Sequence, residues 1–278
     1  MKRVGILYHP VKEATHTLAK ELEEFLTSKG LSVWLTSAWD SEAAGAQVDG
    51  TDLILSIGGD GTILRAAQVT ALKSVPIVGI NLGNLGFMTE LSVSEAREKL
   101  LALLAGKGWI DERSLLEAEL FPAKGEPKPG PFYALNDVVV ARSAIARLIH
   151  VEASIGNELL TIYKADGVIV ATATGSTGYA LAAGGPILYP QSKEILLLPI
   201  APHLSSAYRL VLPSLALIRL RISTAHSATL SIDGHINLPI SVGDVVTVKG
   251  SSATVRFLRI KPEDSFYSSL EQKLKGKE

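Results

Sequence analysis

Gly58-Gly59-Asp60-Gly61-Thr62 follows directly on the apolar run Leu53–Ile57. The run predicts a buried strand, the glycines predict a tight turn, and the amphipathic stretch over about residues 62–72 predicts a helix. Glycines let a backbone approach a phosphate closely and adopt positive φ. The N-terminus of a following helix adds unpaired amides and the positive end of the helix dipole. The stretch therefore predicts an anion-binding turn in an α/β domain.

Asp60 places a carboxylate inside this predicted anion site. A carboxylate repels phosphate, so a turn that only bound phosphate would not contain one. A phosphoryl-transfer site would, because the acceptor hydroxyl must lose its proton there, in some cases beside a metal ion. The alternative interpretation is a strand-to-helix turn capped by an aspartate.

Strands alternate with helices through residues 1–112, as periodic apolar positions indicate. This alternation is typical of a parallel sheet with helices on its faces. Ser94 is a plausible N-cap for the last helix. The predicted strands are 4–8, 31–35, 53–57 and 76–80, and the predicted helices are 12–28, 62–72 and 94–105.

A second glycine-rich segment, residues 81–87 (Asn-Leu-Gly-Asn-Leu-Gly-Phe), follows the fourth predicted strand. Ligands of parallel sheets bind beyond the carboxyl ends of the strands. Because the segment at 58–62 also follows a strand, we expect both turns to face one crevice.

The remainder of the chain has a different pattern, in which turn signals separate short β-prone runs. This pattern predicts an antiparallel β domain. Residues 121–131 predict a loop, because they contain four prolines and two glycines, and residues 237–244 predict a turn-rich connection. We expect domains at 1–112 and 113–254, and a helical tail within 255–278 that packs back on the first domain. The predicted strands are 113–120, 132–141, 146–155, 159–164, 167–171, 194–199, 217–222, 228–232 and 245–249, and the predicted tail helix is 264–274 with Phe266, Leu270 and Leu274 on one face.

Composition excludes several classes of function. The 278 residues carry 27 basic and 28 acidic side chains, so no basic patch indicates a nucleic-acid partner. The absence of cysteine excludes disulfides, thiolate metal sites and a cysteine nucleophile. Residues 1–8 do not form a signal peptide, and no apolar stretch reaches membrane-spanning length.

Asn136-Asp137 interrupts an apolar run. A polar pair in a strand costs stability unless its groups are hydrogen-bonded. One interpretation is a bulge or an edge position, and the other is a pair of acceptors aimed at ribose hydroxyls or a base edge.

Residues 166–186 are rich in small polar residues after a predicted strand. Their hydroxyls can cradle polar ligand groups and Tyr179 can stack on a base, although such loops are also ordinary turns. We expect a structural role for His203, and for His235 either a turn role or a phosphate or ribose contact. No histidines and carboxylates have the spacing of a zinc site, and residues 175–178 are not a nucleophile elbow.

Taken in order, these segments resemble the NAD kinase family, which phosphorylates NAD to NADP. The resemblance runs from Val4 to about Leu274. The Gly-Gly-Asp-Gly-Thr turn alone also occurs in lipid kinases, and a near relative occurs in phosphofructokinases. More specific are residues 81–87, Leu135-Asn136-Asp137, Asp166-Gly167, Thr174-Gly175-Ser176-Thr177-Gly178-Tyr179 and Gly184-Gly185-Pro186.

The resemblance implies a Rossmann-like α/β domain and a mostly antiparallel, β-sandwich-like domain with the active site between them. It implies a cytoplasmic homodimer or homotetramer that uses NAD and ATP, with Mg²⁺ or another divalent cation. We expect no protein cage for the metal, because substrate phosphates supply most ligands of such ions. It leaves open whether polyphosphate replaces ATP, whether NADH is accepted, and whether NADP or NADPH regulates the enzyme.

By position, Asp60 matches the family's proton acceptor for the 2′-hydroxyl of the adenosine ribose. Asn136 and Asp137 match the pair that holds ribose hydroxyls. The other positions with implied nucleotide contacts are Gly61, Arg65, Asp166, Thr174, Thr177, Gly178, Tyr179, Ala180, Leu181 and Ala182 and, at less specific places, Arg147, Lys164 and His235.

This sequence departs from the family pattern at Ala173, Gly178, Ala201 and His235. These changes leave the chemistry intact but bear on the choice between NAD and NADH and on loop rigidity. Two alternatives share parts of the pattern. A lipid kinase needs a membrane-binding surface, and no basic amphipathic helix is present. A non-catalytic NAD(H) sensor would not need Asp60.

Overall fold

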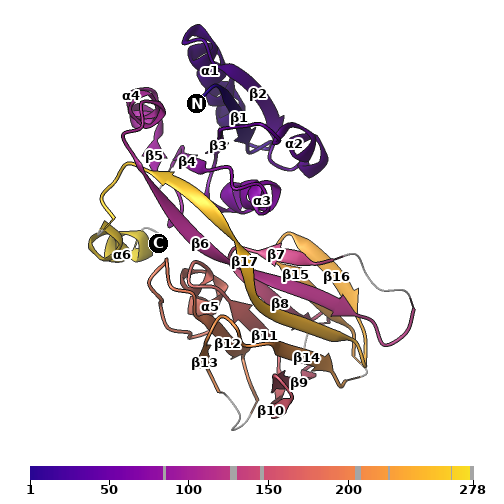
Figure 1. The fold of residues 1–278 in the computed structure, drawn as a ribbon. Helices are drawn as coiled ribbons and strands as arrows, with labels where there is room; N and C mark the ends of the chain where they lie inside the picture. The colour runs from indigo at the N-terminus through magenta and orange to yellow at the C-terminus, as the bar shows by residue number, and fades with distance from the viewer. Residues whose placement is uncertain are drawn as a thin grey trace. The chain divides into compact units, whose positions relative to one another are not determined.

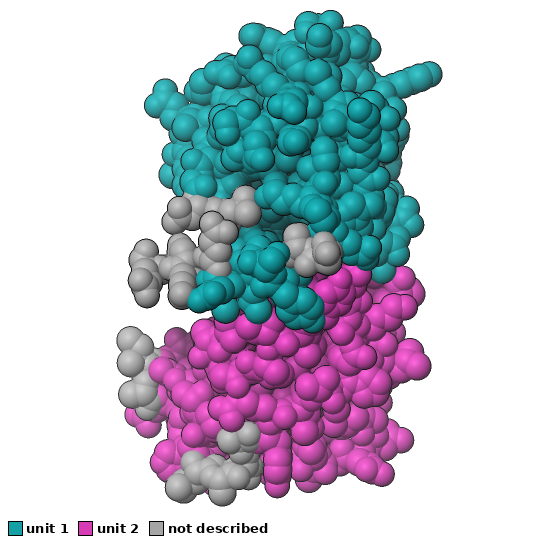
Figure 2. Space-filling view, turned by 90° about the vertical axis from the view of Figure 1, so that its left-hand side faces the viewer, with its two compact units in different colours: residues 1–112, 254–278 teal, residues 113–253 magenta. Residues whose placement is uncertain are grey.

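Four parallel strands form the centre of the first of two units in the computed structural model (Figure 1). This unit comprises Met1–Glu112 and Thr254–Glu278, the second comprises Arg113–Ala253, and Figure 2 colours them separately. The structure describes residues 1–83, 86–125, 130–144, 147–203, 208–224, 226–263 and 265–275. Predictions that fall on Asn84, Leu85, residues 126–129, Ala146, Leu204, Ser205, Asp264 and residues 276–278 lie outside the described residues.

The parallel strands of the first unit lie in the order β2-β1-β3-β4, so the direction of strand addition reverses between β1 and β3. A short strand, β5, pairs with β4. The strands are β1 (Arg3–Tyr8), β2 (Ser32–Ser37), β3 (Leu53–Ile57), β4 (Ile77–Asn81) and β5 (Leu91–Ser92). The helices are α1 (Glu13–Ser28), α2 (Ser41–Gln47), α3 (Asp60–Thr70), α4 (Val93–Leu104) and α6 (Ser265–Lys275).

Helices cover both faces of this parallel sheet. α1 and α4 share one apolar cluster with the strands, and α1 contributes Leu18, Leu22 and Leu26 at helical spacing. α3 packs on the other face, where a Cβ on Gly79 would lie 2.5 Å from Cδ1 of Ile63. The predicted α/β fold class is therefore confirmed. Within the described residues, no helix combines the length and the hydropathy that a bilayer crossing requires.

The second unit is built from antiparallel strands. One sheet has the order β13-β12-β11-β8-β15-β16, and β10, β9, β14 and the first part of β17 form another run of paired strands. One core cluster joins residues from both sets, so they pack face to face as a sandwich. The strands are β6 (Trp109–Phe121), β7 (Phe132–Ala134), β8 (Asp137–Arg142), β9 (Ile149–Ile155), β10 (Glu158–Ala165), β11 (Gly167–Ala171), β12 (Ile195–Ile200), β13 (Leu210–Leu212), β14 (Ile218–Ile222), β15 (Ala228–Ile232), β16 (Ile236–Ile240) and β17 (Val245–Arg259).

The outer face of the six-stranded sheet is also apolar. Ala180, in the short helix α5 (Tyr179–Ala182), packs there against a cluster that includes Ile169 and Leu198. Because both faces of β11 are covered, all its residues are buried and its sequence is continuously apolar. The predicted antiparallel β fold class is confirmed.

The connection predicted over residues 237–244 is wrong in its first half, because β16 occupies it. Pro239 pairs there with Thr229, and a proline is tolerated because β16 is the outermost strand of its sheet. The strand predicted to end at 249 continues to Arg259. Gly250 there mimics a turn signal, but its backbone N–H donates to the carbonyl of Ser214, 2.9 Å away.

Smaller differences concern element ends. The predicted strand 132–141 is divided into β7 and β8, and the predicted helix 62–72 begins earlier, at Asp60. The elements that the sequence did not predict are α2, β5, β13, β16, α5 and the 3₁₀ turn Gly175–Thr177, which are too short for a clear periodic pattern.

Ser92, not the predicted Ser94, caps α4. The backbone N–H and the hydroxyl of Ser92 both donate to Oε2 of Glu95, at 3.1 and 2.7 Å, within a capping box. We expect Ser92→Ala to destabilise the protein by about 1 kcal/mol, as loss of an N-cap does. Denaturant unfolding measures this change, with Ser94→Ala as the matched control. A larger loss in the Ser94 variant would contradict the assignment.

Candidate active site

Asp60 lies in the first turn of α3, immediately after the glycines that end β3. Its carboxylate accepts two backbone hydrogen bonds, one to Oδ2 from Phe87 at 2.9 Å and one to Oδ1 from Met88 at 3.1 Å. Each oxygen keeps a second lone pair for a ligand. The turn after β3 and the described part of the segment after β4 therefore meet at Asp60, as expected from two strand ends that face one crevice.

Gly86 allows this approach. A Cβ built on Gly86 would lie 2.3, 2.7 and 2.8 Å from the three atoms of the Asp60 carboxylate group, distances that no side chain accommodates. The N–H of Gly86 donates to Oγ1 of Thr89 at 2.9 Å, which fixes the loop on its other side. The glycine is required for close packing rather than for an unusual φ.

A buried ion-pair network holds the same loop from the C-terminal end of β17. Nε of Arg259 lies 3.1 Å from Asp111, and its Nη1 lies 3.3 Å from Glu90 and donates to the carbonyl of Met88 at 2.7 Å. Glu90 also accepts the backbone N–H groups of Ile260 and Lys261. Buried charges that are paired and hydrogen-bonded in this way resist displacement. The network therefore orients the residue whose N–H binds Asp60.

Lys273, in α6, lies close to this loop. Its Nζ is 5.8 Å from the centroid of the Phe87 ring. Burial is the main cause that lowers the pKa of Lys273, Arg259 and Lys261 lower it further, and the negative charges of Asp60 and Glu90 oppose these effects. A basic side chain thus lies within electrostatic range of the Asp60 carboxylate.

Two other predicted residues of α3 lie in its first half. Gly61 is exposed in the first turn, where free amides and the helix dipole favour an anion. Arg65 is partly buried, with its guanidinium carbon 4.2 Å from the centre of the Trp39 ring system.

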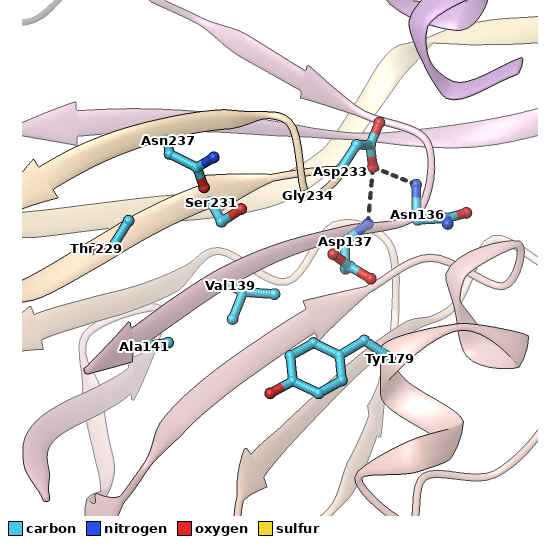
Figure 3. A pocket seen from close by; sticks show the side chains of 10 residues that line it. All are labelled: Asn136, Asp137, Val139, Ala141, Tyr179, Thr229, Ser231, Asp233, Gly234 and Asn237. Carbon is cyan, nitrogen blue, oxygen red and sulfur yellow. Dashed lines mark hydrogen bonds between the residues drawn. The ribbon is translucent and has the colours of Figure 1, made fainter. Parts of the chain in front are cut away.

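The second unit contains a pocket of about 420 Å³ beside the carboxyl end of β15 (Figure 3). Three predicted residues, Asn136, Asp137 and Tyr179, line it. Figure 3 shows Tyr179 facing Asp137 across the opening, from α5. The other lining residues are Val139, Ala141, Thr229, Ser231, Asp233, Gly234 and Asn237. The pocket combines an apolar floor with convergent polar groups, as small-molecule sites do.

Asp233 holds the break between β7 and β8 in place. Its Oδ2 accepts the backbone N–H of Leu135 at 2.9 Å, and its Oδ1 accepts those of Asn136 and Asp137 at 2.7 and 3.1 Å (Figure 3). Asp233 and Gly234 occupy the hairpin turn between β15 and β16 with φ of 48° and 72°. Both positive values match a type I′ turn, for which an Asp-Gly pair is a strong signal.

Asn136 is bent out of the strand direction and packs against a second turn. A Cβ on Gly175 would lie 2.1 Å from the carbonyl oxygen of Asn136, so only glycine fits there. Oδ1 of Asn136 is buried and has no hydrogen-bond partner within the described part of the chain. Buried polar groups in folded proteins are nearly always hydrogen-bonded, so this oxygen is a candidate acceptor for a ligand.

Burial raises the pKa of Asp137 from 3.8 to about 7, and the negative charge of Asp233 contributes to the rise. Burial also raises the pKa of Asp233, against the opposing effect of its three N–H donors and His235. Two buried carboxyl groups beside each other are therefore a feature of this pocket. Such perturbed groups gather at functional sites more often than elsewhere.

We expect Asp137→Asn to stabilise the protein by about 1–2 kcal/mol at pH 8. The variant removes the cost of ionising a buried carboxyl group, and we expect part of the about 1.4 kcal/mol that each pKa unit represents. The folded state binds this proton more tightly than the unfolded state, so the contribution of Asp137 to stability falls as pH rises from about 4 to about 7. The difference between variant and wild type should disappear near pH 4. Thermal unfolding across this range measures it, and a pH-independent difference would contradict the assignment.

The hydroxyls of residues 172–177 are mostly engaged within the protein. Thr172 and Ser176 donate to the carbonyls of Leu135 and Ala173 at 2.5 and 2.6 Å, and Thr177 donates to that of Thr174 at 3.3 Å. They shape the turn that supports Asn136. Of the following predicted residues, Gly178 and Leu181 are partly buried, Ala180 belongs to the core, and Ala182 is exposed.

Asp166 does not line this pocket. It precedes β11, whereas the turn at residues 172–177 follows this strand. Its carboxylate forms a bidentate pair with Arg142, with contacts of 2.6 and 3.2 Å. Arg147 and Lys164 are exposed and also lie outside the pocket lining. His235 lies beside the pocket, and its Nδ1 is 3.1 Å from the carbonyl oxygen of Asp233. The structure thus brings together only part of the predicted set.

Sequence reasoning missed Asp233 as a site residue, together with Thr229, Ser231 and Asn237. The Asp-Gly pair after a predicted strand was an available signal for the hairpin, and period-2 spacing of polar residues on β15 was another. In the described ranges, no group of three or more His, Asp or Glu side chains lies close enough together to hold a metal ion.

Comparison with protein-family models gives two matches. The ATP-NAD kinase N-terminal domain matches residues 4–108, and the ATP-NAD kinase C-terminal domain matches residues 135–260. Among curated relatives, an NAD kinase of Dehalococcoides mccartyi is 50% identical over 99% of this chain and 96% of its own length. An NAD kinase of Chloroflexus aurantiacus is 39% identical over 99% of both chains.

Solved structures give the same result. A yeast NADH kinase complexed with NADH has a TM-score of 0.86 and 27% identity, and the match covers 99% of this chain and 88% of the yeast chain. An NAD kinase from Archaeoglobus fulgidus in complex with ATP has a TM-score of 0.79 and 27% identity, and the match covers 98% of each chain.

Proposed function

The chain belongs to the NAD kinase family and transfers phosphoryl groups to NAD, and we propose that Asp60 takes the proton from the acceptor hydroxyl. The observation that carries the proposal is the carboxylate in the first turn of α3, with each oxygen bound by one backbone N–H of the loop after β4. That arrangement fixes the direction in which the carboxylate faces and leaves lone pairs for a substrate. The acceptor is the 2′-hydroxyl of the adenosine ribose, and the product is NADP.

Positioning contributes more to this reaction than the basicity of Asp60. The transition state of phosphoryl transfer is loose, so the hydroxyl proton leaves late and a weak base is sufficient. The amides of Gly59 and Gly61 and the N-terminal end of the α3 dipole stabilise the donor phosphates. Gly86, Thr89 and the Arg259 network then keep the Asp60 carboxylate in line.

We propose that the donor is ATP and that Mg²⁺ accompanies it. Mg²⁺ loses its water reluctantly and usually takes ligands from substrate phosphates and one or two carboxylates. Asp60 is the carboxylate best placed to serve it, because its oxygens keep free lone pairs. Held there, the ion would supply positive charge to offset the charge that develops on the phosphoryl group.

The pocket of Figure 3 is proposed as the binding site for ribose and base groups of NAD. Oδ1 of Asn136 and the carboxyl group of Asp137 accept ribose hydroxyls, and Tyr179 stacks on a ring. In this proposal residues 1–112 with the tail 255–278 carry the phosphoryl-transfer turn, and residues 113–254 bind NAD. Of the other residues proposed to contact a nucleotide, Gly61 and Arg65 lie on α3 with the phosphoryl-transfer turn. The rest are Arg147, Lys164, Asp166, Thr174, Thr177, Gly178, Ala180, Leu181, Ala182 and His235.

Family membership further supports the proposals of a homodimer or homotetramer and of a cytoplasmic location. Light scattering coupled to size-exclusion chromatography tests the first, because a monomer at working concentration would contradict it. Cell fractionation tests the second.

The activity test is NADP formation by the purified protein from NAD, ATP and Mg²⁺, detected with an NADP-specific dehydrogenase. We expect turnover that depends on all three components. Parallel reactions with polyphosphate and with NADH define the range of donors and acceptors. Tight NAD binding without turnover under every combination would favour a sensor, and flotation with liposomes would favour a lipid kinase.

A further inference from the structure

Three side chains gather beyond the carboxyl ends of β1 and β2, away from the pocket of the second unit. The rings of His9 and Trp39 lie 4.5 Å apart between centroids, and the guanidinium carbon of Arg65 lies 4.2 Å from the centre of the Trp39 rings. Trp39 is 42% exposed, so solvent reaches one side of this cluster. We call these three residues the His9 cluster.

Within the described residues, the His9 cluster lies near positive charges and forms no ion pair with a carboxylate. Burial is the main cause that lowers the pKa of His9, and the positive charges of Lys12 and Arg65 lower it further. Arg65 forms no ion pair with any described carboxylate, whereas Arg97, which also lies over an aromatic ring, is paired with Glu21 at 3.3 Å. The positive charges of Lys12 and Arg65 thus disfavour the protonated ring of His9, and a bound anion would offset both this effect and the burial of Arg65.

The position of the cluster in the fold points to the same ligand. The strand order reverses between β1 and β3, and ligands of open α/β sheets bind at this reversal. The backbone N–H of His9 donates to the carbonyl of Ile57 at 3.1 Å, so His9 lies beside the strand that ends in the glycine turn. Arg65 lies on the same helix as Asp60, and long helical side chains point toward the helix N-terminus.

Within the cluster, His9 and Arg65 can donate hydrogen bonds, and Trp39 supports the guanidinium of Arg65. The N–H of Val11 donates to Nδ1 of His9 at 3.3 Å, so the hydrogen of the neutral ring lies on Nε2. The Trp39 ring system covers one face of the Arg65 guanidinium, whose N–H groups form no hydrogen bond within the described residues. A guanidinium held in this way suits a phosphate, which accepts two parallel hydrogen bonds.

We propose that His9, Trp39 and Arg65 form the subsite for the polyphosphate chain of the phosphoryl donor, supplied either as the triphosphate of ATP or as inorganic polyphosphate. This proposal rests on the phosphoryl-transfer function proposed above and extends it to His9 and Trp39, which follow β1 and β2 and which no sequence motif indicated. Arg65 and His9 Nε2 donate to phosphate oxygens, and Trp39 restricts the guanidinium to one orientation.

Trp39 fluorescence tests binding without requiring turnover. The full-length protein is titrated, without NAD, with ATP, with tripolyphosphate and with adenosine. We expect ATP and tripolyphosphate to change the emission and adenosine to leave it unchanged. Trp39→Phe should remove the signal, while the other tryptophans, Trp34 and Trp109, remain. Arg65→Gln should weaken the binding of both phosphate ligands at least about tenfold, the value of one charge-assisted hydrogen bond.

The matched control is Arg97→Gln, which removes an arginine that is stacked but already paired, and it should bind as wild type does. In turnover, Arg65→Gln should raise the KM for ATP about tenfold or more and change the KM for NAD less than about twofold. Equal affinity of Arg65→Gln and wild type for tripolyphosphate would overturn the proposal. A response to adenosine alone would also overturn it, because the cluster would then bind the base.

The two proposals can fail separately. Asp60→Asn should retain the Trp39 response, because the carboxylate is not part of the subsite. If the wild-type protein binds tripolyphosphate through Arg65 but forms no NADP, the subsite stands and the phosphoryl-transfer assignment fails. If NADP forms but Arg65→Gln changes neither binding nor the KM for ATP, only the subsite is wrong.

Discussion

Asp60→Asn should lower kcat for NADP formation by at least about a hundredfold, the lower range of acid–base contributions. The amide removes the proton acceptor and also disturbs its support, because an asparagine can accept only one of the two N–H groups that Phe87 and Met88 donate. The loss should appear in kcat more than in the KM values, because the substrates still have their other contacts. Steady-state kinetics with NAD and ATP measure both.

The control for Asp60→Asn is Asp49→Asn, which removes a carboxylate that is 72% exposed and paired with Lys73. That variant should keep wild-type turnover. Thermal unfolding and NAD binding of Asp60→Asn establish that the protein is folded. Near-wild-type turnover in a folded Asp60→Asn protein would refute the role of this carboxylate.

Gly86→Ala should lower kcat by about a hundredfold, although Gly86 has no side chain to take part in the chemistry. A Cβ there would lie 2.3 Å from Oδ1 of Asp60, so the carboxylate or the loop must move. A displacement of about 1 Å in a reacting group costs on the order of a hundredfold in rate. Kinetics and a crystal structure of the variant would measure the loss and the displacement.

Gly83→Ala is the matched control, because a Cβ on Gly83 has no atom of the described residues within 4 Å and its φ is not positive. It should retain turnover within about twofold, as exposed substitutions usually do. The double variant Asp60→Asn/Gly86→Ala should be hardly slower than Asp60→Asn, because both changes act on the same carboxylate. If the two losses multiply, Gly86 acts by a route that does not involve Asp60.

The sequence predicted the fold class, the family and the acidic turn, because each depends on local patterns. Apolar runs define β1, β3 and β4 within about one residue, and the two family-model matches confirm the resemblance. Asn136 and Asp137 were found because polar residues are rare inside an apolar run. The role of Asp60 and the remaining contacts stay predictions until they are tested.

The contacts that build the site are long-range, and no sequence period encodes them. Asp233 binds the amides of residues 135–137, which lie almost a hundred positions earlier in the chain. Arg259 binds the carbonyl of Met88, and Gly86 is defined by the space that Asp60 occupies. A single sequence shows these residues as an Asp-Gly turn, a strand arginine and a loop glycine. Only the folded chain shows what each of them touches.

The Arg259 network has a consequence for how the protein is made. A ribosome delivers the N-terminal residues first, and domains usually fold as they emerge. Here the loop that binds Asp60 receives Arg259, Ile260 and Lys261 only after the whole of Arg113–Ala253 has been synthesised. A nascent or prematurely terminated chain therefore contains the acidic turn without the contacts that orient it. The acidic turn gains its orienting contacts only once Lys261 has been translated.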